Sequence, residues 1–323
     1  MMFRESTFEQ KSVALLVSLL FAIVFVSINW EWVFGQQFED RTVYFFMFQG
    51  KPDYDLEFNK DTFFFFLFNE QLWNKGVRFL NISMGLTLHE IFSGVSFLVA
   101  LSYCYFVTSR VGVSGVIFVL NPIFVDLAYS QLRMAAAMVL LLLIFNLKQT
   151  WLRLLLLTAV FFIHTASFLF VMIYLMVHCT IKLSERYNLQ GFMSCAFLTF
   201  GGFVVACFVG PLRVMILEVL GDRRVKYEAD ASGWGYASIW IFILAMSFVQ
   251  KREFFRNYSN AVAVTFLSVF VFCTVFSVYG LRFLSAALPF IFVSLFRFGK
   301  IEKPFVILVF LAFSIVQWVY WVR

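Results

Sequence analysis

Three residues of this sequence combine a reactive or charged group with a place at or inside a long apolar run: Arg133, His164 and Arg282. A guanidinium can hold a phosphate or pyrophosphate through two parallel hydrogen bonds. A neutral imidazole, whose unperturbed pKa is about 6.5, can accept a proton from a hydroxyl, or it can donate a hydrogen bond to a phosphate oxygen. These residue types predict an anion-binding site, and the sequence leaves both roles open for His164.

Each of these residues also has a purely structural interpretation. An arginine near the end of a span can reach the membrane interface with its long side chain, and a lone intramembrane histidine can be hydrogen-bonded to a neighbour. An arginine held at membrane depth, however, costs about 2.5–3.5 kcal/mol on insertion scales. Two arginines and a histidine therefore favour a functional site if the chain topology brings them to the same face of the membrane.

The composition is that of a polytopic membrane protein. Of the 323 residues, 62% are hydrophobic and only 14% are charged, and apolar runs long enough to cross a bilayer recur along the chain. The first run, Val13 to Ile28, meets "NWEWVFG" where a cleavage site would show small residues, so we expect a retained span. The five cysteines stand singly, which predicts no metal site and no disulfide framework, and no cofactor is expected. The net charge of +6 comes without a basic patch interleaved with aromatics, so nucleic acid is not expected as a partner.

Hydrophobicity predicts an all-α protein in which residues 1–323 form a single transmembrane domain. About nine full spans are expected, at 12–30, 87–109, 112–129, 132–147, 190–209, 235–250, 258–278, 282–297 and 304–321. The two long connections, 31–86 and 210–234, are predicted outer loops, the first with a segment that lies on the membrane interface. The second carries Arg223, Arg224 and Tyr227, and it is either a solvated loop or a gate that touches sugar or pyrophosphate.

The stretch 151–181 is too long for one span and too short for two. A single crossing would put the basic segment "KREFFR" at 251–256 outside, against the positive-inside rule. We therefore expect a short helical hairpin with limbs of about 18 and 24 Å whose tip carries His164, for about eleven passes in all. This topology leaves the N-terminus in the cytoplasm and brings His164 and both arginines to the outer face. Irregular backbone at that depth requires burial in protein or a wet cavity.

Three stretches carry a family resemblance: "NPIFVDLAYSQLRMAAAMVLLLL", "LLTAVFFIHTASFLF" and "YGLRFLSAALPF". They resemble the EpsG-like branch of the Wzy-type polysaccharide polymerases, which shows an arginine–glutamine element, a histidine some thirty residues later and a C-terminal arginine after an outer tyrosine. In this sequence Gln131 precedes Arg133 instead of following it. The resemblance covers roughly residues 40–300 and implies a GT-C-like integral membrane glycosyltransferase.

The outer loops add to this resemblance. "PDYDLEF" at 52–58 and "NEQLW" at 69–73 are similar to the family's D-Y-x-x-Y and E-P-L-F elements, with Phe58 at the second tyrosine position and Gln71 in place of proline. The residues that the resemblance places in the catalytic centre are Arg133, His164 and Arg282. The residues expected to contact substrate, including those of the second loop, are Asp53, Tyr54, Glu70, Gln131, Arg223, Arg224, Tyr227 and Tyr279.

The resemblance implies a specific reaction and location. The family joins undecaprenyl-pyrophosphate-linked oligosaccharide repeats into surface polysaccharide, such as O-antigen, capsule or exopolysaccharide, at the periplasmic face of the bacterial inner membrane. The growing chain leaves its lipid pyrophosphate and is attached to a hydroxyl of a new lipid-linked unit. Breaking the anomeric bond develops charge on the pyrophosphate, which pre-organised cations stabilise. The implied partners are the lipid-linked donor and acceptor, membrane lipid and a chain-length regulator.

Two other functions remain open. A lipid-linked oligosaccharide flippase also needs a cationic cavity and many spans, but it should carry charge inside several spans and show related halves. This chain collects its charge at one predicted outer rim and shows no internal repeat. An O-antigen ligase, which moves finished glycan onto a lipid A core, would use the same kind of donor. Loss of polymerisation with retention of a single capped repeat would separate a polymerase from a ligase.

Overall fold

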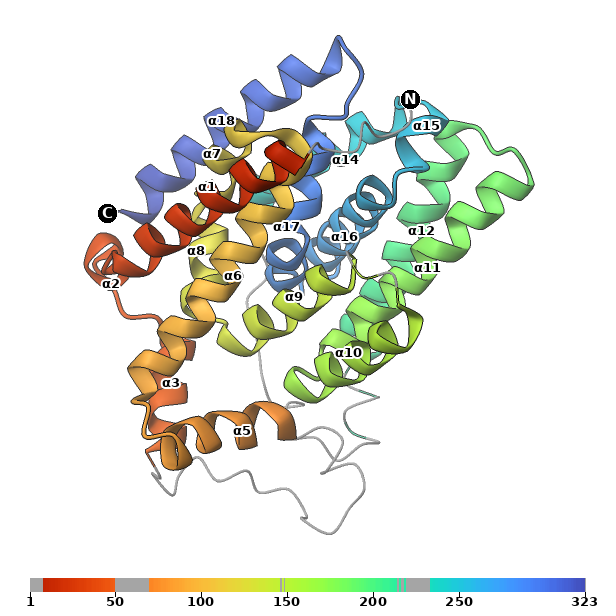
Figure 1. Ribbon diagram of the computed structural model, residues 1–323. Helices are drawn as coiled ribbons and strands as arrows, with labels where there is room; N and C mark the ends of the chain where they lie inside the picture. Colours follow the sequence, from red (N-terminus) through yellow and green to blue (C-terminus); the bar gives the residue numbers. More distant parts are fainter. Residues whose placement is uncertain are drawn as a thin grey trace. The chain divides into compact units, whose positions relative to one another are not determined.

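The computed structural model describes residues 8–49, 70–145, 147, 149–213, 215, 218 and 233–322, and every regular element among them is a helix (Figure 1). Two compact units divide the chain: an N-terminal unit of Ser6–Phe168 with Gln317–Arg323, and a C-terminal unit made mainly of Leu169–Val316. Six of the described helices are long and apolar enough to cross a membrane: α1 (Phe8–Ser27), α6 (Leu88–Val111), α11 (Ser167–Arg186), α12 (Gly191–Val209), α16 (Tyr258–Val275) and α18 (Glu302–Trp321). The described part of the protein is therefore all-helical, and the protein is a polytopic membrane protein.

The N-terminal unit is built around α6. Helix α1 packs along α6, and α6 also contacts α8 and α9. Thr87 and Glu90 form a reciprocal capping box at the start of α6, so this helix begins at a defined residue. The other described elements of the unit are α2 (Trp30–Phe34), α3 (Glu39–Phe48), α5 (Gln71–Arg78), the π-helix η2 (Phe79–Ser83), the 3-10 helix η3 (Val113–Gly115), α7 (Val116–Val119), α8 (Pro122–Tyr129), α9 (Leu132–Ile144) and α10 (Thr150–Ile163).

The expected span 112–129 is not continuous. The structure divides it into η3, α7 and α8, with a break at Leu120 and Asn121. The local reason is Pro122, which has no N–H and disfavours helical backbone at the residue before it. Asn121 takes extended dihedral angles, and its side chain accepts a hydrogen bond from the Ile123 N–H at 3.0 Å, which caps α8.

Helices α8 and α9 form a bent pair with an angle of 102° at Ser130 and Gln131. A break inside an apolar segment frees backbone carbonyls, which must find other donors. Ser96 donates to the carbonyl of Ala128 at 2.7 Å, and Arg41 donates to the carbonyl of Tyr129 at 3.2 Å. Side chains from α6 and α3 thus stabilise the bend. If α8 and α9 together form one span, they supply a seventh membrane crossing in the described part of the chain.

The predicted break at His164 is present. Helix α10 ends at Ile163, His164 has extended backbone angles, and α11 begins at Ser167. The first limb has 14 residues, about 21 Å, as expected of a short helix. The second limb is longer than expected, because α11 continues to Arg186 and its 20 residues, about 30 Å long, pass the test for a membrane span alone.

The C-terminal unit is built around α16, which contacts α12, α14 and α17. Gly202 permits the close approach of α12 to α16, since a Cβ there would lie 2.5 Å from the Cβ of Ser268 and 2.7 Å from the carbonyl oxygen of Thr265. The remaining elements of the unit are α14 (Trp234–Phe248), α15 (Arg252–Phe255) and α17 (Leu281–Leu295). Helices α10, α14 and α17 are apolar but shorter than a full span.

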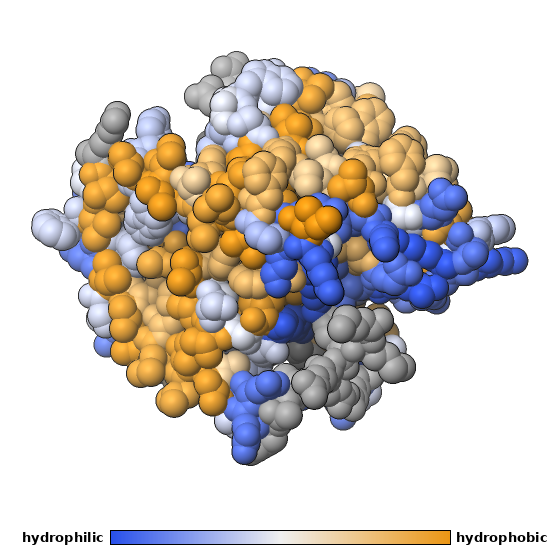
Figure 2. Space-filling model, turned by 90° about the horizontal axis from the view of Figure 1, so that it is seen from above, coloured by the Kyte–Doolittle hydropathy of each residue, from blue (hydrophilic) through white to orange (hydrophobic). Residues whose placement is uncertain are grey.

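The outer surface is rich in apolar side chains. Figure 2 shows hydrophobic residues over much of the face that it views. Helix α1 exposes Leu16 and Leu20, and α18 exposes Leu308 and Ile315. Exposed apolar faces of this extent on two long helices are what contact with lipid tails requires.

Candidate functional site

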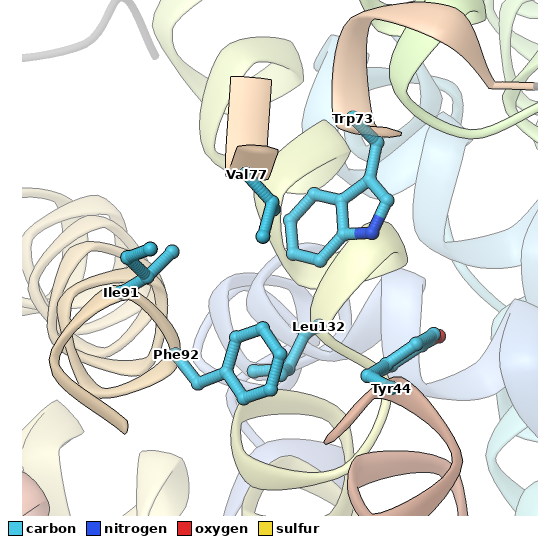
Figure 3. Close-up of a cluster of buried hydrophobic side chains, with 6 residues drawn as sticks. All are labelled: Tyr44, Trp73, Val77, Ile91, Phe92 and Leu132. Atoms are coloured by element: carbon cyan, nitrogen blue, oxygen red, sulfur yellow. The ribbon is translucent and has the colours of Figure 1, made fainter. Parts of the chain in front are cut away.

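A buried apolar cluster joins the elements that carry the candidate site. Trp73 and Val77 of α5 pack against Tyr44 of α3, Phe92 of α6 and Leu132 of α9, with Ile91 at the edge (Figure 3). The rings of Tyr44 and Trp73 lie 6.0 Å apart, and those of Tyr44 and Phe92 lie 6.2 Å apart. This packing brings the N-terminal end of α5 close to the start of α9, so Glu70 and Arg133 can meet.

Glu70 is the centre of a polar network. It lies immediately before α5 in a left-handed conformation, with φ 46° and ψ 48°, and its side chain is only 9% exposed. One carboxylate oxygen, Oε2, forms an ion pair with Nη1 of Arg133. The other, Oε1, lies 3.0 Å from Nδ1 of His164 and accepts a hydrogen bond from the backbone N–H of Thr165 at 3.2 Å. A single carboxylate therefore joins residues that the sequence predicted to share a site.

Arg133 is the most exposed of the three charged or titratable side chains in this network. Its Nε donates to the hydroxyl of Tyr44 at 3.0 Å, and its Cζ lies 5.0 Å from the centre of the same ring. The side chain is 34% exposed, compared with 9% for both Glu70 and His164. Within the described part of the chain, Nη2 has no hydrogen-bond partner. One edge of the guanidinium is thus fixed, and the other is available to an anion.

His164 is placed by the break between α10 and α11. Its backbone N–H still bonds to the carbonyl of Val160 at 3.1 Å, and its own carbonyl accepts from the N–H of Ser167 at 2.9 Å. With φ −147° and ψ 110°, the residue leaves the helix and turns its ring toward Glu70. The Nε2 atom on the far side of the ring is buried.

The low pKa of Glu70 determines which ring nitrogen of His164 carries the proton. Burial by itself raises the pKa of the Glu70 carboxyl, but the charge of Arg133 and the hydrogen bonds from His164 and Thr165 outweigh burial and lower this pKa to about 2. Glu70 is then ionised at neutral pH and can only accept hydrogen bonds. Because of this, the proton on the imidazole of His164 must be at Nδ1, where it donates to Oε1.

Three other predicted residues, Gln131, Arg282 and Tyr279, have contacts of their own in the described structure. Gln131 does not contact this network: its Nε2 donates to Oδ2 of Asp126 at 2.6 Å across the bend, and the residue is 4% exposed. Arg282 and Tyr279 belong to the C-terminal unit, where the Arg282 Cζ lies 5.8 Å from the centre of the Tyr279 ring. The remaining predicted residues, Asp53, Tyr54, Arg223, Arg224 and Tyr227, lie outside the described residues.

Sequence reasoning missed two residues around this network, Tyr44 and Arg41. Tyr44 is the one hydroxylated ring in the helical segment "VYFFMF", and a buried hydroxyl needs a partner, which is a weak signal that could have identified it. Arg41 is 2% exposed, and its Cζ lies 4.0 Å from the centre of the Tyr129 ring. No pattern in the sequence distinguishes Arg41 from a solvated loop arginine.

In the described residues, the network joins one guanidinium, one carboxylate and one imidazole. The described residues contain no group of three or more histidine, cysteine or acidic side chains that could hold a metal ion. Comparison with family models, curated proteins and solved structures finds no match for the chain.

Proposed function

We propose that this protein is a membrane glycosyltransferase that polymerises undecaprenyl-pyrophosphate-linked oligosaccharide repeats into surface polysaccharide. The observation that supports this function best is the convergence of Arg133, Glu70 and His164 on one network. These residues are far apart in sequence, and the resemblance to EpsG-like polymerases places all three in the site.

The chemistry follows from the exposed edge of Arg133. The anomeric C–O bond of the donor breaks, its electron pair leaves with the lipid pyrophosphate, and the acceptor hydroxyl oxygen bonds to the anomeric carbon. A fixed guanidinium stabilises the charge that develops on the leaving oxygens without reorganisation. Arg133 is the second residue of α9, so the positive end of the helix dipole adds to its charge. The proton of the acceptor hydroxyl goes to water or to a base on the substrate side of the site.

The finer features of the proposal come from the sequence. They are a GT-C-like fold with about nine full spans and about eleven passes, a bacterial inner membrane location, and an active site on the periplasmic face. Arg282, beside Tyr279, would supply a second cation, and the two outer loops would contact sugar. A second cation is chemically useful, because Glu70 cancels much of the charge of Arg133 while a pyrophosphate carries more than one negative charge.

One observation favours a second candidate, a flippase for the same lipid-linked oligosaccharide. Transporters often bind substrates at discontinuous helices, and α8 and α9 form such a broken pair with a 102° bend next to Arg133. A flippase and a polymerase differ in what accumulates after deletion of the gene. Loss of the flippase removes surface repeats altogether, whereas loss of the polymerase leaves a single repeat attached to the cell surface.

The test is a gel analysis of surface glycan from a deletion strain complemented with variants. Arg133→Lys keeps the charge but loses the planar fork, so we expect loss of the long ladder with the single repeat retained at normal protein abundance. Arg153→Lys is the matched control, because Arg153 is exposed and bonds only to the carbonyl of Leu147. A full ladder from the Arg133 variant would refute the proposed role of the guanidinium, and absence of all surface repeats in the deletion strain would favour the flippase.

A further inference from the structure

Glu70, Arg133 and His164 differ in whether they can contact a substrate. The Nδ1 of His164 is committed to Glu70, and its Nε2 is buried. Glu70 has both carboxylate oxygens engaged. Arg133 is the most exposed of the three, at 34% of its side chain compared with 9% for Glu70 and for His164. Direct contact with a substrate is therefore open to the arginine and closed to the histidine.

We propose that His164 is a positioning residue: its Nδ1–H holds Glu70, and Glu70 in turn holds the Arg133 guanidinium that binds the anionic substrate. The inference rests on the proposed function for the identity of that anion, a pyrophosphate. It assigns His164 neither of the two roles expected from the sequence, proton acceptor or phosphate ligand, since both require an accessible Nε2.

The hydrogen bonds at Glu70 explain how a histidine could act at a distance. Two donors, Nδ1–H of His164 and the N–H of Thr165, meet at Oε1 and fix the plane of the carboxylate. That plane sets the direction of Oε2 toward Nη1 of Arg133. Tyr44 holds Nε from the other side, so the guanidinium is restrained at two of its three nitrogens. Without the hydrogen bond from His164, the Glu70 carboxylate could rotate, and the Arg133 guanidinium would change its direction with it.

Amide substitutions at His164 separate the three roles, because asparagine places an N–H near the position of Nδ1 and glutamine places one nearer to Nε2. The assay is isothermal titration of the purified full-length protein, in phosphatidylcholine nanodiscs, with inorganic pyrophosphate. We expect His164→Asn to bind within about threefold of wild type, and His164→Ala and His164→Gln to bind about tenfold or more weakly, as for loss of a hydrogen bond to a charged group. The control is His178→Asn at an exposed histidine, which should bind normally.

Two outcomes would overturn the inference. Normal binding by His164→Gln with weak binding by His164→Asn would indicate a phosphate contact through Nε2. Normal pyrophosphate binding by all three variants, with loss of the glycan ladder in all three, would indicate a proton acceptor.

A measurement that needs no ligand keeps this inference distinct from the proposed function. The chain has only three histidines, so ¹⁵N-histidine NMR of wild type and His164→Asn identifies the signal of His164. The inference requires the Nδ1–H tautomer in wild type and its perturbation in Glu70→Gln but not in Arg153→Lys. An Nε2–H tautomer would refute it. If the Nδ1–H tautomer is found but wild type binds no pyrophosphate, the positioning contact stands and the proposed function fails.

Discussion

Replacement of Glu70 by glutamine removes the charge at the centre of the network with little change of shape. A carboxyl whose pKa falls from 4.5 to about 2 on folding contributes about 3 kcal/mol to stability at neutral pH. Solvent offsets part of this amount, since the partner Arg133 is 34% exposed. We therefore expect Glu70→Gln to lower the free energy of unfolding by about 1–3 kcal/mol at pH 7. Unfolding of detergent-solubilised protein by heat or SDS measures the difference.

The pH dependence of that difference tests its cause. The pKa of Glu70 is lower in the folded protein, so its contribution is present above the unfolded pKa of 4.5 and is lost as the pH falls toward about 2. Wild type and Glu70→Gln should differ most at neutral pH and converge between about pH 4.5 and pH 2. The control is Glu39→Gln, at an exposed carboxyl, which should change stability by less than about 0.5 kcal/mol. A difference between wild type and the Glu70 variant that stays constant over this pH range would refute the ionic interpretation.

Two further predictions concern the phenol of the network and the chain topology. Tyr44→Phe keeps the ring near Arg133 but loses the hydrogen bond from Nε, so the affinity for pyrophosphate should fall by about threefold to tenfold. The control is Tyr187→Phe at an exposed tyrosine, which should bind pyrophosphate normally. Equal affinities of the Tyr44 variant and wild type would exclude a role for the hydroxyl. Cysteines that replace Arg223 and Lys251 should be labelled by a membrane-impermeant reagent from outside and inside respectively, and labelling of both from one side would remove the basis for the predicted orientation.

The signals that sequence reasoning interpreted correctly are local. Polar residues interrupt an apolar run at His164 and Thr165, and α10 ends at Ile163, where the interruption begins. Likewise, Arg133 stands at the start of a helix that runs through an uninterrupted apolar stretch. Such features depend on a few neighbouring residues, so a single sequence contains them.

The contacts that make the network are not local, and the sequence alone could not supply them. Glu70 lies 63 residues before Arg133 and 94 before His164, and only the family resemblance indicated it. The resemblance also placed Gln131 among the substrate contacts, and in the structure this residue lies at the bend, where its side chain donates to Asp126. A helix that continued through Gln131 would place this side chain differently, and the sequence analysis did not predict the 102° break.

Helix α3 connects the 102° break to the candidate site. Arg41 and Tyr44, three residues apart, lie on one face of α3. Arg41 donates to the carbonyl of Tyr129 at the end of α8, and Tyr44 accepts from Arg133 at the start of α9. One short helix therefore contacts both sides of the bend, and the direction of the Arg133 fork depends on the docking of α3 as well as on Glu70. A change in the docking of α3 would therefore alter the direction of the most exposed side chain of the network, Arg133.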